Sequence, residues 1–442
     1  MKTKKEIIFS PSYIPIITFI IFSFLSLLFC CFFAYAENEA KTDLDNKNVS
    51  NILQKQNNFA LKFTSELVKA EVNERSERNI FISPFSLTMA LNLVLNAVDG
   101  STKNELFRVM NENQDSLEKI NSANKLLLEN LSSSTSSDNS NTDNNNNNGS
   151  VFTLEIANGL WVDMNFPVYP EYKNLVEKFY YAKSSMLDFS DPKAVEQIND
   201  WVSLKTHNKI TKILSSEDLQ RLVMLLANAT YFKGQWESPF SKDSTDSNGL
   251  FYSWGENSRG NKVLMMKQRN DWSYWEDEKV QVVEMPYKKS SVSAYVILPR
   301  QKGYKAFVQE GKRIWTDKFW HQLSNQSESR TGILKMPKFK FEYKKILNDD
   351  LKNVGIKSIF SNNANFSKLT PKSVQVSFVL QKTFVNVDEY GTEAAAVTAV
   401  GIRYTSAPPT SPFVMNVNRP FYFIIRENNS GSFLFAGLII KP

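Results

Sequence analysis

The sequence is poor in the residues from which most metal and redox sites are built. In 442 residues it has two cysteines, Cys30 and Cys31, both inside an apolar N-terminal run, and two histidines, His207 and His321. If that run is removed, no cysteine is left for a disulfide, a thiol nucleophile or a cysteine-bound metal. No His-x-x-x-His or Cys-x-x-Cys spacing occurs, so no zinc site is expected. We predict neither a metal nor another cofactor.

The signatures of common enzyme classes are also missing. No Gly-x-Ser-x-Gly elbow accompanies the two histidines, as a Ser-His-Asp hydrolase would require. No glycine-rich loop has the spacing that cradles a phosphate or a dinucleotide. Adjacent carboxylates such as Asp349–Asp350 and Asp388–Glu389 are more often solvated turns than acid–base pairs. We predict that the protein is not an enzyme.

What the chain does contain is apolar bulk with little charge imbalance. Hydrophobic residues make up 42% of it, with 32 Phe and 8 Trp, which is enough for one large core. The formal net charge is +6, from 52 basic and 46 acidic residues, and no dense basic run is present. Nucleic acid is therefore not an expected partner.

The N-terminus has the pattern of a secretory signal. Lysines within the first five residues precede an apolar stretch over 14–33, which is followed by Ala34-Tyr35-Ala36. This pattern predicts a signal peptide over 1–36 and a secreted, extracellular protein. Because the apolar stretch is long for a signal peptide, an uncleaved membrane anchor formed by residues 14–33 stays open. Candidate glycosylation sites of a secreted chain are Asn48, Asn130, Asn148, Asn325 and Asn365.

Periodicity predicts an α+β fold in a single domain over 51–442, after a polar linker over 37–50. Helical spacing is found early, over 52–72, 85–97 and 192–214, with Gly100 expected to end the second of these helices. From residue 263 onward, strand patterns dominate, which favours large mixed or antiparallel sheets. Residues 132–150 are Ser, Thr, Asp, Asn or Gly throughout, which predicts a disordered insert on the surface of that domain.

One segment fits two structures. Thr392–Ala396 could form a short helix capped by Thr392, but the stretch from Thr392 to Val400 also alternates like a strand. In the strand, one face carries only small or apolar uncharged residues, and the other starts with Glu393. Such a strand could slide into an existing sheet without overpacking the core, with Gly391 as a pivot. Pro, Gly and Ser after Val400 then predict a long open loop.

These residues resemble the hinge of inhibitory serpins. Seven other motifs resemble the same family, in its order, from about residue 52 to the C-terminus. The hinge residues that carry the resemblance are Glu389, Gly391, Thr392, Glu393, Ala394, Ala395, Ala396 and Thr398. The other motifs are Asn79–Ser86, Asn228–Trp236, Met336–Phe339, Leu351–Ile356, Ala364–Ser367, Asn418–Phe421 and Phe433–Gly437.

The resemblance implies the serpin fold, with helices packed around three β-sheets and an exposed reactive-centre loop at about 389–412. It also implies a suicide-type inhibitor: a serine protease cleaves the loop, forms an acyl-enzyme, and the freed hinge inserts as a new central strand. Register counted from Gly391 places the cleaved bond at Thr405–Ser406, which suits an elastase-like protease. A shift of two residues would place it at Arg403–Tyr404, which suits a trypsin-like protease.

Further positions are implied by the same resemblance. Ser83, Ser86 and Asn228 match the polar shutter cluster beneath the sheet, and Trp236 matches the aromatic residue of the breach at its upper opening. The two serines also fit simply as a helix cap and a satisfied core hydroxyl. Gln381 stands where the family usually has His, which puts a pH-sensitive opening in doubt. Asn228 is expected to be buried and its sequon unused.

Partners follow from these matches. The helix that binds heparin in some serpins corresponds to residues 117–131, which offer only Lys119 and Lys125, so heparin binding is unsupported. We expect a monomer whose partner is a serine protease. The alternatives are a non-inhibitory serpin acting as a carrier or chaperone, and a membrane-anchored interaction protein.

Overall fold

The computed structural model describes residues 47–73, 75–110, 116–133, 152–219, 222–254, 260–393 and 412–442. The chain divides into two units, Met1–Asn51 and Ile52–Pro442, and the second contains every sheet described below. The predicted signal peptide, most of the polar insert and residues 394–411 of the predicted loop lie outside the described residues. Among the described helices, none combines the length and apolarity needed to cross a bilayer.

The first helices form as their periodicity predicts. Residues 52–71 are helical, and α2 (Pro84–Ala97) is capped by the Ser83 side chain with Pro84 in its first turn. All 14 residues of α2 are buried, because the helix contacts strands of two different sheets. Gly100 does not end α2, which stops at Ala97; it starts the next helix with φ +58°. The helices that follow are α3 (Gly100–Met110), α4 (Leu117–Ser133) and α5 (Pro170–Tyr180).

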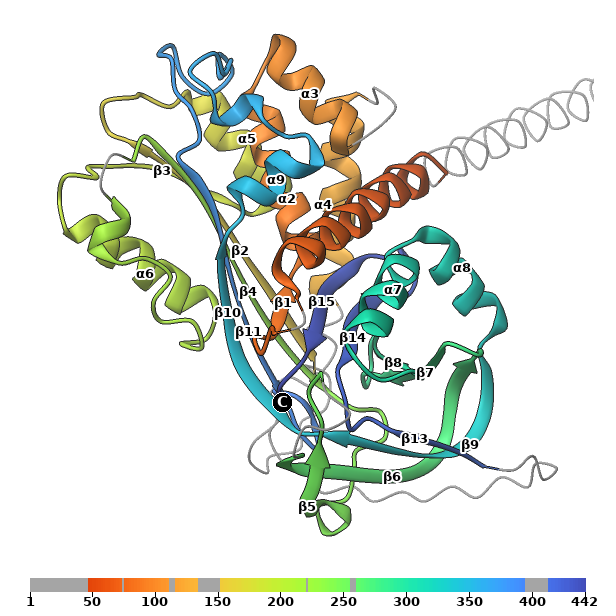
Figure 1. The fold of residues 1–442 in the computed structure, drawn as a ribbon. Helices are drawn as coiled ribbons and strands as arrows, with labels where there is room; N and C mark the ends of the chain where they lie inside the picture. The colour runs from red at the N-terminus through yellow and green to blue at the C-terminus, as the bar shows by residue number, and fades with distance from the viewer. Residues whose placement is uncertain are drawn as a thin grey trace, which may run out of the picture. The chain divides into compact units, whose positions relative to one another are not determined.

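A six-stranded sheet crosses the molecule between these helices and α6 (Lys193–Lys205), which lies on the opposite side of this sheet from β1 and β15 (Figure 1). Its two longest strands are antiparallel neighbours that pair along almost their whole length. In spatial order the strands are β10 (Phe339–Ile346), β11 (Phe378–Val387), β12 (Gly391–Thr392), β4 (Met224–Gln235), β2 (Phe152–Asp163) and β3 (Lys183–Leu187).

The other strands form a nine-stranded set with two parts. The parts are joined where Ser273–Glu276 of β6 pair with β7, so together with the six-stranded sheet they make the three predicted sheets. One part contains β5 (Asp246–Phe251), β6 (Asn261–Glu276), β9 (Glu328–Pro337) and β13 (Phe413–Asn416). The other contains β1 (Ile80–Ile82), β15 (Phe433–Ile439), β14 (Phe421–Glu427), β8 (Val292–Pro299) and β7 (Val280–Pro286).

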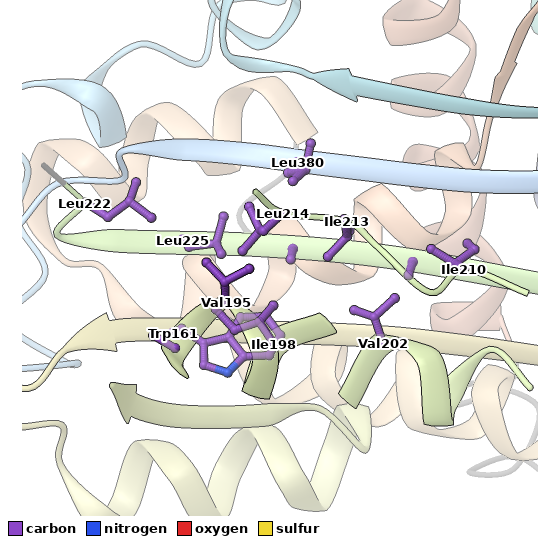
Figure 2. Close-up of a cluster of buried hydrophobic side chains, with 14 of the residues drawn as sticks. Trp161, Val195, Ile198, Val202, Ile210, Ile213, Leu214, Leu222, Leu225 and Leu380 are labelled. Carbon is purple, nitrogen blue, oxygen red and sulfur yellow. The ribbon is translucent and has the colours of Figure 1, made fainter. Parts of the chain in front are cut away.

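Apolar side chains of α6 and of the segment after it cover the outer face of the six-stranded sheet. Figure 2 shows Val195, Ile198 and Val202 of α6 packed with Leu225 of β4 and Leu380 of β11. The predicted helix over 192–214 is too long, because α6 ends at Lys205 and the next residues leave the helical region, with φ +50° at 207 and +61° at 208. The spacing of 210, 213 and 214 looked helical because all three residues face the sheet.

The prediction that strands dominate the second half of the chain is incomplete. Three helices interrupt the strands there: α7 (Tyr304–Ile314), α8 (Asp317–Gln326) and α9 (Asn348–Val354). Within this region, Lys338 separates β9 from β10, which belong to different sheets. Short 3-10 turns complete the described elements: η2 (Ser216–Leu219), η3 (Lys242–Ser244) and η4 (Ser358–Phe360).

Candidate functional site: the opening between two central strands

Two central strands of the six-stranded sheet are paired at one end and parted at the other. β11 and β4 run parallel and pair directly where Phe378–Thr383 face Leu225–Thr230. Further along, β12 lies between them and is antiparallel to both, with Thr392 opposite Val387 on one side and Gly234 on the other. The chain that leaves β11 therefore turns back and occupies the first position of the opening.

A buried amide holds the paired region to the helix beneath it. Gln381 of β11 accepts a hydrogen bond from the Ser83 backbone N–H (3.0 Å) and donates to the Ser83 carbonyl (3.0 Å). Its amide nitrogen also donates to Asn228 Oδ1, at 2.6 Å. Gln381 is 1% exposed, so these bonds form away from water, where they are strongest. Gln381 thus fastens the sheet to the N-terminus of α2.

The cluster extends across β4 to β2. Asn228 donates to the Ser86 hydroxyl and to Asn158 Oδ1 (2.5 Å), and Ser83 Oγ accepts from the Ser86 backbone N–H (3.2 Å). All four residues are at most 2% exposed. The structure therefore brings Ser83, Ser86 and Asn228 together with Gln381, and Ser83 is also the predicted helix cap. Asn158 was missed, although a lone Asn in an apolar strand was a signal for it.

Aromatic side chains line the parted end. Trp236 is 1% exposed and stacks on Tyr287, with ring centroids 4.7 Å apart and an interplanar angle of 20°. Its indole N–H donates to the Asp388 carbonyl at 3.1 Å, and its backbone N–H donates to the Tyr390 carbonyl at 2.9 Å. Trp236 therefore fixes the turn between β11 and β12. Sequence reasoning missed Tyr287, which directly follows β7, forms an isolated bridge with Trp236 and has no local signal.

The pKa values of two adjacent carboxylates in this turn are shifted in opposite directions. Burial tends to raise the pKa of Glu389, but hydrogen bonds from Lys338 (2.7 Å) and the Thr245 hydroxyl (2.8 Å) outweigh it and hold the pKa below its ordinary value. Burial raises the pKa of Asp388, because the backbone N–H groups that bond its carboxylate compensate only in part. Glu389 is thus the ionised anchor of the turn.

Thr392 is already seated in the opening. Its side chain is 1% exposed and bonds the Tyr287 hydroxyl at 2.7 Å, on the core side of the sheet. Burial raises the pKa of Tyr287 well above its usual value, so the phenol stays protonated and able to donate. The two hydroxyls bond each other in place of water, so the desolvation of Thr392 on burial is largely offset.

Gly391 is needed for a different reason from the predicted one. A Cβ at this position would lie 2.0 Å from the Gly234 carbonyl oxygen and 2.9 Å from the Cα of Gln235, both backbone atoms of β4. Its φ is outside the left-handed region, which is adopted instead by Glu393, at +56°. Glycine is therefore required by close approach of two backbones, and the left-handed conformation is adopted two residues later.

Glu393 closes the described part of the hinge. Its backbone N–H donates to the Asn386 carbonyl (2.6 Å), and its carboxylate pairs with Lys209 at 2.5 Å. The side chain is only 10% exposed, and its second oxygen has no hydrogen-bond partner among the described residues. Lys209 belongs to the segment that follows α6 and packs on the outer face of the sheet. An ion pair that no sequence spacing predicts therefore joins this segment to the hinge.

Several predicted positions cannot be placed in this site. Ala394, Ala395, Ala396 and Thr398, and the candidate bonds Thr405–Ser406 and Arg403–Tyr404, lie outside the described residues, as does Asn148. Of the candidate glycosylation sites, Asn130, Asn325 and Asn365 are exposed and Asn48 is half-buried, whereas the Asn228 side chain is fully buried, as expected.

This arrangement contains no catalytic constellation among the described residues: the polar cluster is saturated with internal hydrogen bonds, and the carboxylates anchor a turn. It offers instead a sheet with a defined place for one more strand, whose first residues are already there.

Comparison with known proteins agrees with this geometry. Residues 54–442 match the family model described as serpin (serine protease inhibitor). The chain is 30% identical to human Serpin B3 over 389 residues, covering 86% of this chain and 98% of that protein. It is 30% identical to human leukocyte elastase inhibitor over 391 residues, again covering 86% and 98%. The crystal structure of human thyroxine-binding globulin complexed with thyroxine superposes with a TM-score of 0.74 at 24% identity, covering 88% of this chain and 99% of that one. The chain belongs to the serpin family.

Proposed function

We propose that the protein is a suicide-type inhibitor of a serine protease, which inserts its cleaved hinge between β4 and β11. The observation that carries the proposal is β12, which already occupies the first position between these strands in the antiparallel sense that a complete insertion needs. The nucleophile belongs to the attacking protease, so this chain needs no catalytic residue of its own.

The register of β12 with β11 and β4 determines which residues an inserted strand would face on the core side of the sheet. Continued from Thr392, it brings Thr398 level with Gln381 of β11 and Asn228 of β4, so the hydroxyl meets the polar cluster. Between them, Ala394 and Ala396 come level with apolar or hydroxyl positions of both strands. Small side chains on this face let the strand enter without displacing the close-packed core.

The opposite face of the inserted strand suits its cover. In the same register Ala395 comes level with Phe384, and Ala399 comes level with Leu380, both in the apolar cluster beneath α6. The residues after Glu393 therefore present apolar groups to the apolar layer shown in Figure 2. A strand with alternating charge would leave buried charges there.

Insertion replaces one pair of hydrogen-bonded strands by two such pairs. The direct pairing of β11 with β4, six residue pairs long, must open, and the new strand then hydrogen-bonds to both partners. The uncleaved chain keeps the loop tethered between β12 and β13, so the more stable arrangement is kinetically withheld until a protease cuts.

The register also bounds the cleavage site. Gly401 is the last residue that comes level with the paired region, opposite Phe378 and Leu225. Both candidate bonds, Thr405–Ser406 and Arg403–Tyr404, lie beyond it and are compatible with full insertion. We favour Thr405–Ser406, and hence a protease with an elastase-like pocket; leukocyte elastase inhibitor is one of the relatives.

The test is incubation of the mature chain with trypsin and with pancreatic elastase, followed by denaturing electrophoresis and by thermal unfolding of the loop-cleaved product. We expect a denaturant-resistant complex with at least one protease and a cleaved form that melts well above the intact one. Clean cleavage with neither effect contradicts the proposal and favours a carrier or chaperone role. Mass spectrometry of the released peptide identifies the cleaved bond.

A pair of variants separates insertion from loop recognition. Thr398→Glu would place a carboxylate level with the buried Gln381 and should convert the inhibitor into a substrate. Ser411→Glu adds the same charge after both candidate bonds, in the part that does not insert, and should preserve complex formation. Equal behaviour of the two variants would contradict the inserted register.

We also propose that the protein is secreted after removal of residues 1–36. N-terminal sequencing of the natural product tests this, since a chain that starts at residue 37 supports secretion and one that retains residues 14–33 supports the anchored alternative. Glycopeptide mapping should find no glycan on Asn228, whose amide nitrogen is buried in the polar cluster.

A further inference from the structure

Three neighbouring strands, one of which follows the predicted loop in the sequence, present a cationic face. β6, β9 and β13 run side by side (Figure 1), and opposite residues in paired strands share a face of the sheet. Lys267 of β6 lies opposite Lys335 of β9, and in the next row Arg269 lies opposite Ile333, which in turn lies opposite Val414 of β13. We call these five residues the basic face.

Folding does not neutralise this charge. Among the described residues, Lys267, Arg269 and Lys335 make no ion pair and no side-chain hydrogen bond. Like charges directly opposite each other on paired strands repel, so the pairing of Lys267 with Lys335 lowers the stability of the fold. Two carboxylates lie on the same face beside these cations: Asp271, two residues beyond Arg269, accepts a hydrogen bond from the Thr331 hydroxyl, and Asp246 lies opposite Met265, two residues before Lys267.

The face also carries two apolar residues, one of them on the edge strand β13, and its strands are packed into the core on their other side. Val414 is 55% exposed, and its register partner Ile333 is half-buried. The opposite sides of the same strands are packed into the core, with Met266, Leu334 and Met415 all fully buried. An apolar anchor framed by polar or charged groups on ordered strands is the usual composition of a protein-binding surface.

The position of this face limits what reaches it. Val414 follows the Thr405–Ser406 bond by few residues, and an extended chain spans at most about 3.5 Å per residue, so the two lie within roughly 30 Å of each other. A globular protease is on the order of 40 Å across. A protease that holds this bond in its active site therefore has part of its surface within reach of the basic face.

We propose that the basic face is a secondary contact site for the attacking protease, and that it selects proteases with an acidic surface beside the active-site cleft. This inference rests on the proposed function, because it takes the loop to be the segment that the protease attacks. Attraction between the basic face and an acidic protease surface acts before the protease engages the loop. It therefore raises the association rate constant, and salt screens it.

The test measures how fast trypsin and pancreatic elastase consume the intact chain, as complex plus cleaved product, at about 30 mM and about 300 mM NaCl. The variant is Lys267→Glu/Arg269→Glu/Lys335→Glu. The control, Lys119→Glu/Lys312→Glu/Lys318→Glu, makes the same charge change at exposed residues of α4, α7 and α8. A peptide copy of residues 394–411 reports loop recognition alone.

We expect the first variant to slow consumption by at least one of the two proteases about tenfold at low salt and much less at high salt. The control variant should change the rate less than twofold, and the peptide should show no salt dependence. Equal losses in both variants, or no loss with either protease, overturn the proposal. So does heparin binding that disappears in the first variant while its protease rates are unchanged. The summed rate reports the basic face, whereas the ratio of complex to cleaved product reports insertion, so either idea can fail without the other.

Discussion

Replacing Gln381 with Ala should loosen the central sheet by a predictable amount. The substitution removes three hydrogen bonds at a position that is 1% exposed. The Ser83 carbonyl keeps a second partner in the Leu87 N–H, so two buried groups are left unpaired: the Ser83 N–H and Asn228 Oδ1. At about 1–3 kcal/mol each, the free energy of unfolding should fall by about 2–6 kcal/mol.

The measurement is urea unfolding of the intact protein, with thermal unfolding beside it. A chain of this length loses on the order of 1 °C in midpoint per kcal/mol, so the Ala variant should melt a few degrees lower. Gln381→Met fills nearly the same volume without hydrogen bonds and separates lost bonding from lost packing. The exposed Gln301→Ala is the control and should change the free energy by less than about 0.5 kcal/mol. If the Met variant unfolds at the wild-type midpoint, the hydrogen-bond reasoning is wrong.

The remaining predictions concern the turn and the hinge. Gly391→Ala places a methyl group against the Gly234 carbonyl and should expel β12, so hydrogen exchange at 391–393 should accelerate at least tenfold; unchanged exchange would contradict the close approach. Lys209→Met leaves the Glu393 carboxylate buried without its cation, and exchange should accelerate in the same segment, whereas Lys205→Met should have no effect. The folded pKa of Glu389 lies below its ordinary value, so the stability that it contributes is complete above about pH 5 and is lost as pH falls through the folded pKa. In Glu389→Gln that part of the acid destabilisation should vanish from urea midpoints measured between pH 3 and pH 7, and an unaltered pH profile would exclude the ion pair as its source.

Local features were predictable because their causes are local. Ser83 followed by Pro84 identifies the start of α2 without reference to any other part of the chain, and the structure shows that cap. The strand patterns after residue 263 were predictable for the same reason: β8, for example, is apolar along nearly its whole length.

The failures arose where tertiary contacts set the pattern. Ile210, Ile213 and Leu214 have helical spacing but are buried by a sheet that they cross as an irregular segment. Gly391 was identified as a special position, but glycine is needed there because the backbone of Gly234 lies so close, and Gly234 belongs to a strand far away in the sequence. The ion pair of Lys209 with Glu393 joins residues 184 positions apart, and only the folded chain brings them together.

The tether at the far end of the loop has a consequence for how long the uncut protein lasts. β13 is joined to β9 by only four residue pairs, beginning at Phe413, while β12 already draws on the other end of the same stretch. If the proposed insertion began without cleavage, each further residue entering between β4 and β11 would shorten the segment that leads to β13, and complete insertion would require β13 to separate from β9. On the proposed mechanism, the lifetime of the uncleaved protein would therefore depend on the pairing of that short strand as well as on the polar cluster that joins β4 to β11.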